Sequence, residues 1–238
     1  GHLREIGRDP AQAKHNVFFM KASSCICPPN ADIVRPAHVQ VLDYENELGL
    51  ILRQDINGPI VVTEDNLHEW IGAFVITNDV SAREEQVSAE QFHKAKSHRT
   101  FGPTGPFLVL VDANEARRWQ ELVIKTVVNG DVRQDCPAGD MIFGPVETLN
   151  ELSRMRDMQA GDMIATGTPA GVAMKVPGKI GMFFAQMLST EKRLSIFLNS
   201  QAKNPKVLRP GDQISLSIAT PDGTLDLGVQ NNRIVAAS

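Results

Sequence analysis

Three carboxylates alternate along the stretch LDYENELGLIL, residues 42–52. If this stretch is a strand, successive side chains point to opposite faces, so Asp43, Glu45 and Glu47 share one face. Residues two apart on a strand lie roughly 6.6 Å apart, close enough for like charges to repel unless a cation or hydrogen-bond donors lie between them. The pattern is consistent with either the solvated outer face of an antiparallel sheet or a divalent metal site.

A further carboxylate, Asp79, ends the apolar run before it. An ionised carboxylate at the end of a buried strand needs a partner. With Glu45 and Glu47 it would give one cation three oxygen ligands and leave positions for water and substrate, which suits Mg²⁺ or Mn²⁺. The dipeptide Asn78-Asp79 is also a common turn signal, which is the simpler interpretation of this acid alone.

Polar side chains that could bind a substrate occur at four further positions. The forked donor of Arg83 and the amide of Gln86 suit a carboxylate or keto oxygen, although either could lie on the surface. Lys96 could place its ammonium against a developing enolate. Thr168, in TGTPAG, offers a hydroxyl and nearby backbone donors to a carboxylate, or forms a structural turn.

The start of the chain reads as a helix that carries His2 and Glu5 one turn apart. Glu5 could fix the tautomer of the His2 ring, which would then take a proton from water. Such a pair is commonplace on solvated helices, so the spacing alone favours no role. Cys25 and Cys27 have no histidine paired with them in the sequence, and we expect inert thiols rather than nucleophiles.

The remaining pattern predicts a single β-rich domain over residues 1–238 with few helices. Residues 81–97 have helical propensity but weak apolar periodicity, so they are expected to wrap over a surface. Residues 175–206 combine large apolar residues with lysines and could be a lid, an interface or a decorated loop. The predicted strands are 39–52, 59–63, a strand ending at 79, 107–111, 122–130 and 163–167, and the clearest amphipathic helix is 146–155.

Composition excludes several classes of partner. The formal net charge of −4 provides no basic field for nucleic acid or an anionic membrane, and no apolar run approaches the length of a membrane span. The cytoplasm is the default expectation. The three cysteines lack the paired spacing of a zinc ribbon or a disulfide framework.

Four motifs in fixed order give the chain a specific resemblance to the fumarylacetoacetate hydrolase family: LDYENELGLIL, ITNDVSAREEQ, KSHRTFGPTGP and GDMIATGTPAGV. The resemblance covers nearly the whole chain. It implies an α+β, β-rich fold, a mixed β-sheet roll of the C-terminal-domain type of that family with few short helices. It also implies a homodimer.

By this resemblance Glu45, Glu47 and Asp79 are the ligands of one Mg²⁺ or Mn²⁺ per chain. Family members that cleave acylpyruvates carry a His-x-x-Glu on a helical lid near the start, which assigns the catalytic dyad to His2 and Glu5 and the lid and its linker to residues 1–16. The family also uses a lysine at the position of Lys96, and Arg83, Gln86 and Thr168 are expected to bind substrate.

The chain departs from the family in ways that bear on its substrate. Many relatives read Lys-Ser-Phe-Asp where this chain has Lys96, Ser97, His98 and Arg99, and the usual Lys-Pro after the first strand is Lys21-Ala22. The segment 175–206 is longer than the usual connection.

Three functions follow as expectations. The first is metal-dependent hydrolysis of a carbon–carbon bond in a β-diketo acid such as an acylpyruvate or a fumarylacetoacetate-like compound. The second is decarboxylation of oxaloacetate or keto–enol tautomerisation at the same metal site. The third is a catalytically silent binding protein that keeps the fold, for which the departures at 98 and 99 are the main support.

Overall fold

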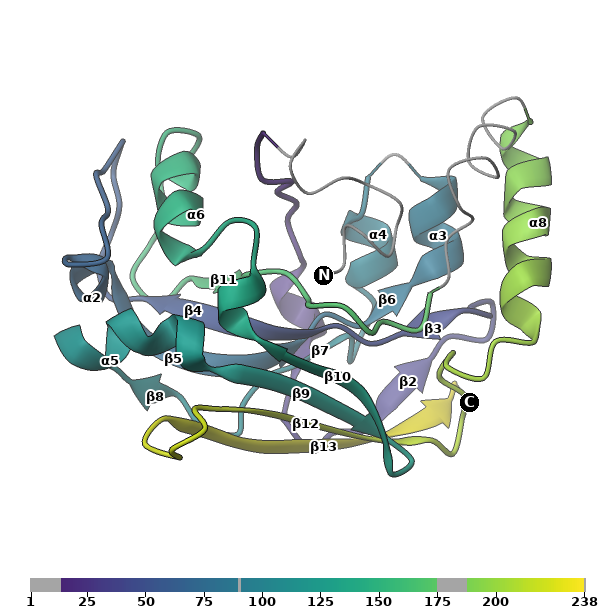
Figure 1. The fold of residues 1–238 in the computed structure, drawn as a ribbon. Helices are drawn as coiled ribbons and strands as arrows, with labels where there is room; N and C mark the ends of the chain where they lie inside the picture. Colours follow the sequence, from purple (N-terminus) through teal and green to yellow (C-terminus); the bar gives the residue numbers. More distant parts are fainter. Residues whose placement is uncertain (1–13, 90, 175–187, 238) are drawn as a thin grey trace.

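The computed structural model describes residues 14–89, 91–174 and 188–237, and it stacks two β-sheets against each other (Figure 1). Neighbouring strands of the described residues pair antiparallel, except that β13 with β2 and β1 with β7 are parallel. One sheet has the order β10 (Asp131–Pro137), β9 (Val123–Val128), β12 (Gln213–Ala219), β13 (Asp226–Ala236) and β2 (Ile33–Arg35), and the other has β11 (Met163–Ala165), β4 (Asn46–Leu52), β5 (Ile71–Asn78) and β8 (Val109–Leu110). Two short pairs complete the strands: β1 (Ile26–Cys27) with β7 (Gly102–Pro103), and β3 (Leu42–Asp43) with β6 (Ser81–Ala82).

The helices are short, as expected. They are α2 (Leu67–Trp70), α3 (Arg83–Ser88), α4 (His93–Lys96), α5 (Ala113–Arg117), α6 (Pro145–Leu152) and α8 (Thr190–Ala202), with 3₁₀ turns η2 (Ser23–Cys25), η3 (Arg118–Glu121) and η4 (Ala138–Asp140). The amphipathic helix predicted at 146–155 is α6, where Pro145 takes the first helical position and the Glu147 carboxylate accepts the Gly144 N–H at 3.0 Å. The mixed, β-rich α+β fold predicted from the sequence is confirmed.

The two sheets differ in how many faces they bury. On β9 burial alternates strictly, with Ile124, Thr126 and Val128 pointing inward. Strands β4 and β5 are buried on both faces, because the five-stranded sheet covers one side and α3, α4 and α6 lie on the other (Figure 1). Side chains on either face of β4 are therefore removed from water.

The single strand predicted over 39–52 was wrong in one respect. The chain forms β3 and β4 with a break at Tyr44 and Glu45, since β3 pairs with β6 while β4 pairs with β5. At the break, the Asp43 carboxylate accepts the Tyr44 N–H at 2.8 Å, and the Glu45 carbonyl accepts the Asp79 N–H at 2.8 Å. The strict alternation of the three carboxylates is interrupted there.

The strand predicted at 59–63 is also wrong, because its backbone bonds to side chains at the end of α6. Asn150 accepts the Val62 N–H and donates to the Val62 carbonyl, both at 2.9 Å, and the Ser153 hydroxyl accepts the Ile60 N–H at 3.2 Å. No neighbouring strand is needed to satisfy these groups.

Residues 175–187 of the segment 175–206 lie outside the described residues, and 190–202 form helix α8. Ser189 caps this helix by accepting the Lys192 N–H, and Phe197 packs with Val41 and Val207 in a small apolar cluster. The helix therefore docks against α3 and the residue before β3 (Figure 1). None of the described helices is both long and apolar enough to span a membrane.

Candidate metal centre

The register of β4 and β5 brings Glu45, Glu47 and Asp79 together. Asn46 pairs with Asn78 and Glu47 with Thr77, so the residues at the start of β4 lie beside the end of β5. Oxygen atoms of the three carboxylates lie within 4.8 Å of one another, and all three side chains are buried. Burial excludes the solvated outer face that the alternation alone left open.

Cationic side chains neutralise two of these carboxylates. The Lys96 ammonium donates to Glu45 Oε2 at 2.7 Å and to Asp79 Oδ2, and the Arg83 guanidinium lies 2.5 Å from Glu45 Oε1. Lys21 donates to Asp79 Oδ1 at 2.5 Å and to the Phe101 carbonyl at 2.6 Å. Burial alone would lower the pKa of Lys96, but the carboxylates of Asp79 and Glu45 hold it above its ordinary value.

Glu47 is the carboxylate left without an ion pair among the described residues. Its Oε2 accepts the Gly167 N–H at 2.9 Å. Burial, with the nearby charges of Asp79 and Glu45, raises the pKa of Glu47 well above its ordinary value of 4.5. A buried carboxylate that faces two others is an environment that favours a bound cation.

This donor set fits a hard divalent cation. Three convergent carboxylates supply the oxygen ligands that Mg²⁺ and Mn²⁺ prefer, and no histidine or cysteine belongs to the group. A divalent cation held by Glu45, Glu47 and Asp79 would act as a Lewis acid on a bound keto acid.

A buried network around Arg83 holds the cluster in place. Arg83 is almost fully buried; its Nε donates to Asp43 Oδ2 at 2.8 Å, and its Nη1 donates to Gln86 Oε1 at 2.7 Å. Although burial would lower the pKa of Arg83, Asp43 and Glu45 raise it above its ordinary range. The guanidinium and the Gln86 side-chain oxygen thus bond within the protein, which favours a role of Arg83 in positioning Glu45. Direct contact of Arg83 or of the Gln86 NH₂ group with a substrate stays a prediction.

Thr168 lies close to the carboxylates, but its hydroxyl is used structurally. It donates to the Asn46 carbonyl at 3.2 Å and accepts from Gln134 Nε2 at 2.8 Å. The preceding N–H, of Gly167, bonds to Glu47. The turn predicted at TGTPAG therefore meets the cluster through its backbone, while contact of Thr168 with substrate stays a prediction.

Sequence reasoning missed two residues of the centre. Lys21 was noted only as a departure from a Lys-Pro pair, and Asp43 was grouped with the possible metal ligands. Asp43 instead accepts the Ala173 and Met174 N–H groups at 2.7 and 3.0 Å, besides Arg83. The signal for Lys21 was available in principle, because three buried carboxylates need more positive charge than Lys96 alone supplies.

An aromatic side chain lies over one ammonium of the centre. The Lys96 Nζ is 5.3 Å from the centroid of the Phe19 ring, and Phe19 makes an edge-to-face contact with Phe92 at 5.5 Å. Phe19 is partly exposed, so it places an apolar surface between Lys96 and solvent.

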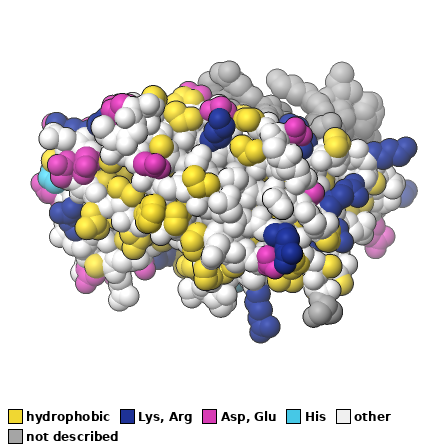
Figure 2. Space-filling view, turned by 90° about the horizontal axis from the view of Figure 1, so that it is seen from below, with side chains coloured by type: hydrophobic (Ala, Val, Ile, Leu, Met, Phe, Trp, Pro, Cys, Tyr) yellow, Lys and Arg dark blue, Asp and Glu magenta, His cyan; other side chains and the backbone are white. Residues whose placement is uncertain are grey.

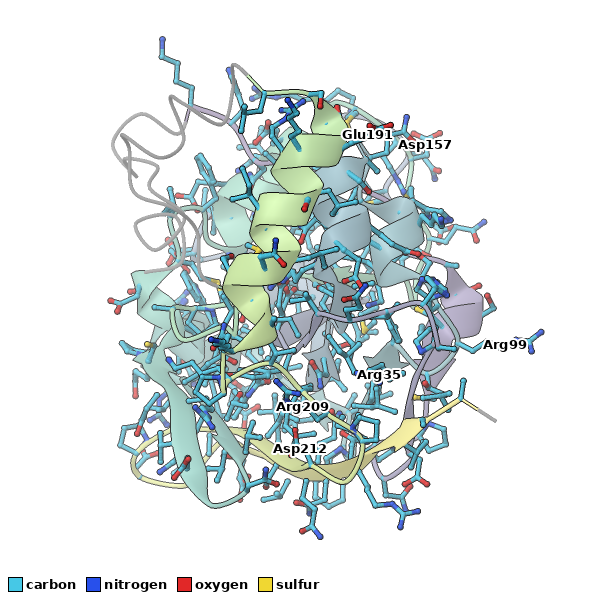
Figure 3. The ribbon with its side chains drawn as sticks, turned by 90° about the vertical axis from the view of Figure 1, so that its right-hand side faces the viewer. Arg35, Arg99, Asp157, Glu191, Arg209 and Asp212 are labelled. Carbon is cyan, nitrogen blue, oxygen red and sulfur yellow. The ribbon has the colours of Figure 1, made fainter. Side chains whose placement is uncertain are left out.

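The remaining predicted site residues are placed as follows. His2 and Glu5 lie outside the described residues. Cys25 is fully buried and Cys27 partly so, and burial raises the pKa of both thiols, which disfavours a thiolate nucleophile. Arg99 is exposed and extends away from the fold (Figure 3).

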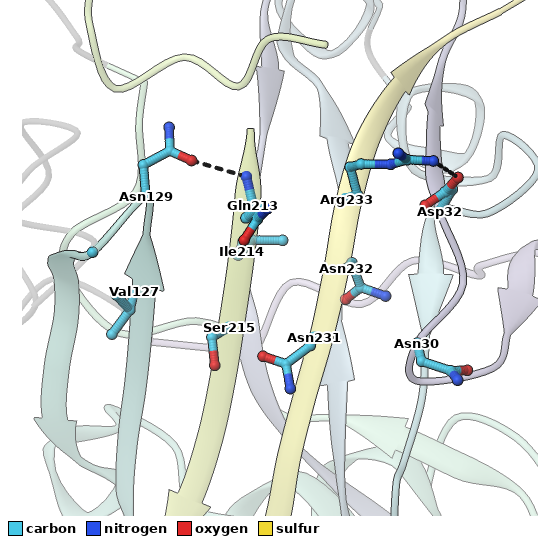
Figure 4. Close-up of a pocket in the computed structure, with 11 residues that line it drawn as sticks. Asn30, Asp32, Val127, Asn129, Gln213, Ile214, Ser215, Asn231, Asn232 and Arg233 are labelled. Carbon is cyan, nitrogen blue, oxygen red and sulfur yellow. Dashed lines mark hydrogen bonds and ion pairs between the residues drawn. The ribbon is translucent and has the colours of Figure 1, made fainter. Parts of the chain in front are cut away.

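A separate cavity of about 390 Å³ lies on the five-stranded sheet, and its lining includes none of the three carboxylates (Figure 4). Two of its charged or amide groups have partners inside the protein: Asp32 pairs with Arg233 at 2.9 Å, and Asn129 Oδ1 accepts the Gln213 N–H at 2.9 Å. Asn232 Oδ1 in the same lining is buried without one among the described residues. The carboxylate cluster is the better candidate for chemistry.

Comparison with known proteins agrees with this geometry. Residues 1–235 match the model of the fumarylacetoacetate (FAA) hydrolase C-terminal family. The chain belongs to the fumarylacetoacetate hydrolase family. The resemblance that the four motifs carry is thereby confirmed.

Relatives in this family carry different activities in their names. The chain is 34% identical over 227 residues to the oxaloacetate tautomerase YisK of Bacillus subtilis, covering 94% of this chain and 64% of that protein. It is 38% identical over 175 residues to protein Rv2993c of Mycobacterium tuberculosis, covering 72% and 62%. The chain thus spans less than two thirds of the length of these curated relatives.

Solved structures give the same fold. A fumarylacetoacetate hydrolase from Exiguobacterium antarcticum matches with a TM-score of 0.73 and 33% identity, covering 99% of this chain and 71% of that one. A 2-hydroxyhepta-2,4-diene-1,7-dioate isomerase from Mycobacterium marinum matches with a TM-score of 0.71 and 27% identity, covering 95% and 71%.

Proposed function

We propose that this chain is a metal-dependent enzyme that acts on a small 2-keto acid by stabilising its enolate. The convergence of three buried carboxylates beside the Lys96 ammonium is the observation that carries the proposal. The cation would be Mg²⁺ or Mn²⁺, one per chain, held by Glu45, Glu47 and Asp79.

Lys96 is the side chain of the described site best suited to a developing negative charge. Its ammonium has three N–H donors, and within the described residues two of them go to Glu45 and Asp79. The third can donate to the enolate oxygen of the substrate. A preorganised donor of this kind is worth about 3 kcal/mol of transition-state stabilisation.

The leading reaction is hydrolysis of a carbon–carbon bond in an acylpyruvate or related β-diketo acid. In this reaction His2, oriented by Glu5, takes a proton from water as the water attacks the distal carbonyl. Cleavage leaves the electron pair of the broken bond on the pyruvate enolate, which Lys96 stabilises until the carbon is protonated. If residues 1–16 form the lid that the family resemblance implies, its closure over the site would exclude bulk water during these steps.

A second candidate is keto–enol tautomerisation or decarboxylation of oxaloacetate. The relation to an oxaloacetate tautomerase over 94% of this chain favours it. It shares the enolate and the Lys96 donor with the hydrolase but needs no activated water. His2 is therefore the residue that separates the two candidates.

One experiment tests the proposal and separates its forms. Purified protein with Mn²⁺ or Mg²⁺ is assayed against a panel of acylpyruvates for pyruvate release and against oxaloacetate for enol loss and decarboxylation. The hydrolase predicts metal-dependent pyruvate release that falls about 10²–10⁴-fold in His2→Ala. Decarboxylation of oxaloacetate needs no activated water and should fall less in this variant, and a tautomerase is distinguished by loss of the enol without release of pyruvate.

Glu47→Gln supplies the test of the metal site, and Glu84→Gln is its matched control. Both glutamates are buried, but Glu84 accepts backbone N–H groups of Gln40 and Val41 and lies outside the cluster. Glu47→Gln should abolish metal-dependent activity and weaken Mn²⁺ binding, whereas Glu84→Gln should retain both. Metal binding unchanged in Glu47→Gln, or no activity of the wild type on any substrate with metal present, would contradict the proposal.

We also propose that the chain forms a homodimer through an apolar patch at the β8 edge, made of Phe107, Leu108, Leu110 and Val229. Each of these side chains is more than half exposed, and Phe107 packs over Gly228, the neighbour of Val229. Seen from below the view of Figure 1, hydrophobic side chains gather on the left half of the molecule (Figure 2). A second copy that covered this edge would bury them.

A further inference from the structure

His38, Glu85 and His98 form a second group of convergent side chains, away from the three carboxylates. The ring Nε2 atoms of His38 and His98 lie 2.9 and 2.8 Å from Glu85 Oε1 and Oε2, respectively. The ligand atoms of the three residues fall within 4.8 Å of one another. The centroids of the two imidazole rings lie 5.6 Å apart, and the ring planes are tilted by 57° to each other.

The fold holds these side chains in place from three separate segments. Glu85 lies in the first turn of α3 and is buried, and His98 follows α4 and packs edge-on against Phe101 at 5.0 Å. His38 precedes β3, and the neighbouring Glu84 fixes this segment by accepting the Val41 N–H at 3.2 Å. The cluster is therefore built by tertiary structure rather than by adjacency in sequence.

Two imidazole nitrogens and one carboxylate form a donor set unlike that of the first centre. Imidazole suits Zn²⁺ and related transition metals, whereas a set of carboxylates alone suits Mg²⁺ or Mn²⁺. In a tetrahedral zinc site with bonds of about 2.0–2.1 Å, neighbouring ligand atoms lie about 3.3 Å apart. The observed 2.8 and 2.9 Å run to different oxygens of Glu85, and one ligand atom from each residue lies within 4.8 Å of the others. Side-chain shifts of up to about 1.5 Å would bring these atoms to the tetrahedral spacing.

Exposure leaves room for water to complete the coordination. The side chain of Glu85 is 9% exposed, that of His98 21% and that of His38 61%. Glu85 is thus anchored inside the protein, while the His38 side of the cluster is open to solvent. Sites with three protein ligands and an open position are a common arrangement for zinc.

We propose that His38, Glu85 and His98 bind one Zn²⁺ or a chemically similar transition-metal ion. Each ring coordinates through Nε2 and carries its proton on Nδ1. When the ion binds, a neutral ring that holds its proton on Nε2 moves it to Nδ1, and a doubly protonated ring releases its Nε2 proton to solvent. The ion replaces the two ring-to-carboxylate hydrogen bonds. Because α3 also carries Arg83 and α4 carries Lys96, the ion ties together the helices that supply two cations of the first centre.

Lys94 is the competing cation at this cluster. Its ammonium lies 3.6 Å from Glu85 Oε1, and its side chain is largely exposed, so it can swing into solvent when the ion binds. Lys94→Gln should therefore leave zinc binding intact or strengthen it. If the cluster is only a set of ion pairs, zinc binding should not depend on any of these residues.

The test is a calorimetric titration of the purified full chain with Zn²⁺. Excess Mg²⁺ is present throughout so that the carboxylate centre does not take up Zn²⁺. The wild type should bind one Zn²⁺ per chain, and His38→Ala and His98→Phe should each weaken this binding by at least about tenfold, because each removes one of three ligands. Co²⁺ added in place of Zn²⁺ gives a visible absorption band whose intensity reports the imidazole ligands. Mg²⁺ affinity measured separately in each variant checks that the chain remains folded.

His15→Ala is the matched control, because His15 lies 3.9 Å from Glu151 without belonging to a group of three metal-binding side chains among the described residues. It should bind Zn²⁺ as the wild type does. Zinc binding that is absent from the wild type, or equal in wild type, His38→Ala and His98→Phe, would overturn the proposal. Either result would leave the proposed function untouched, since that function uses a different set of ligands.

Discussion

Replacement of Asp43 by asparagine should destabilise the protein strongly, although the substitution is nearly isosteric. Asp43 is fully buried, and its two oxygens accept four hydrogen bonds. Oδ1 accepts the N–H groups of Tyr44 and Ala173 at 2.8 and 2.7 Å, and Oδ2 accepts Arg83 Nε at 2.8 Å and the Met174 N–H at 3.0 Å. An amide has one oxygen, so in the variant an NH₂ group faces two donors.

The magnitude follows from the charge that is left behind. Removal of one partner of a buried ion pair costs about 3–5 kcal/mol, because the other charge stays buried without compensation. Among the residues that the structure describes, Arg83 keeps only Glu45 as an anionic partner, so we expect Asp43→Asn to lower the free energy of unfolding by about 3–5 kcal/mol. The matched control is Asp32→Asn, since Asp32 pairs with Arg233 at 2.9 Å on the exposed surface and should contribute about 0–1 kcal/mol.

Urea denaturation followed by circular dichroism and by tryptophan fluorescence measures both variants. The double variant Asp43→Asn/Arg83→Met removes the stranded charge as well, so its loss should be smaller than the sum of the two single losses. If the free energy of unfolding of Asp43→Asn lies within about 1 kcal/mol of the wild-type value, the buried Asp43–Arg83 pair does not hold α3 to the break between β3 and β4.

Two further predictions concern pH and assembly. Burial would raise the pKa of Glu85, but hydrogen bonds from His98 and His38 hold it below its ordinary value of 4.5. Because the pKa is lowered in the folded state, the carboxylate stabilises the protein above about pH 4.5, and this contribution is lost as the pH falls through the folded pKa. The difference in unfolding free energy between wild type and Glu85→Gln should therefore shrink on acidification below about pH 4.5, and a difference that grows there would contradict the assigned sign. For assembly, Leu110→Asp should shift the protein from dimer to monomer in analytical ultracentrifugation, while Val132→Asp, an equally apolar exposed position on β10, should not; a monomeric wild type would refute the dimer.

The sequence was sufficient to predict that Glu45, Glu47 and Asp79 meet. Their positions depend only on two neighbouring strands and on an apolar run that ends at Asp79. The same motifs predicted the family and the β-rich fold. Whether the three carboxylates ligate a metal stays a prediction, as do the roles of His2 and Glu5.

What could not be predicted depends on contacts between distant segments. Asp43 leaves the acidic face because β3 pairs with β6, a partner about forty positions along the chain that no local pattern reveals. The strand expected at 59–63 has the right residue types but finds hydrogen bonds on Asn150 instead of a neighbouring strand. Local propensity is the same in either case, so only the tertiary structure distinguishes them.

Helix α3 explains why apolar periodicity was a poor guide to the surroundings of the site. Arg83, Glu84 and Glu85 are consecutive and all buried, and successive residues of a helix point about 100° apart. One turn therefore contacts three different partners: Glu45 with Asp43, the backbone before β3, and the two histidines. A helix fixed in this way needs no apolar stripe, and its weak amphipathicity reflects burial against polar groups rather than exposure to solvent. The Arg83 contact to Glu45 therefore depends on buried charges, so Arg83→Met should disturb the carboxylate cluster more than Val87→Ala, which truncates a partly exposed side chain on the same helix.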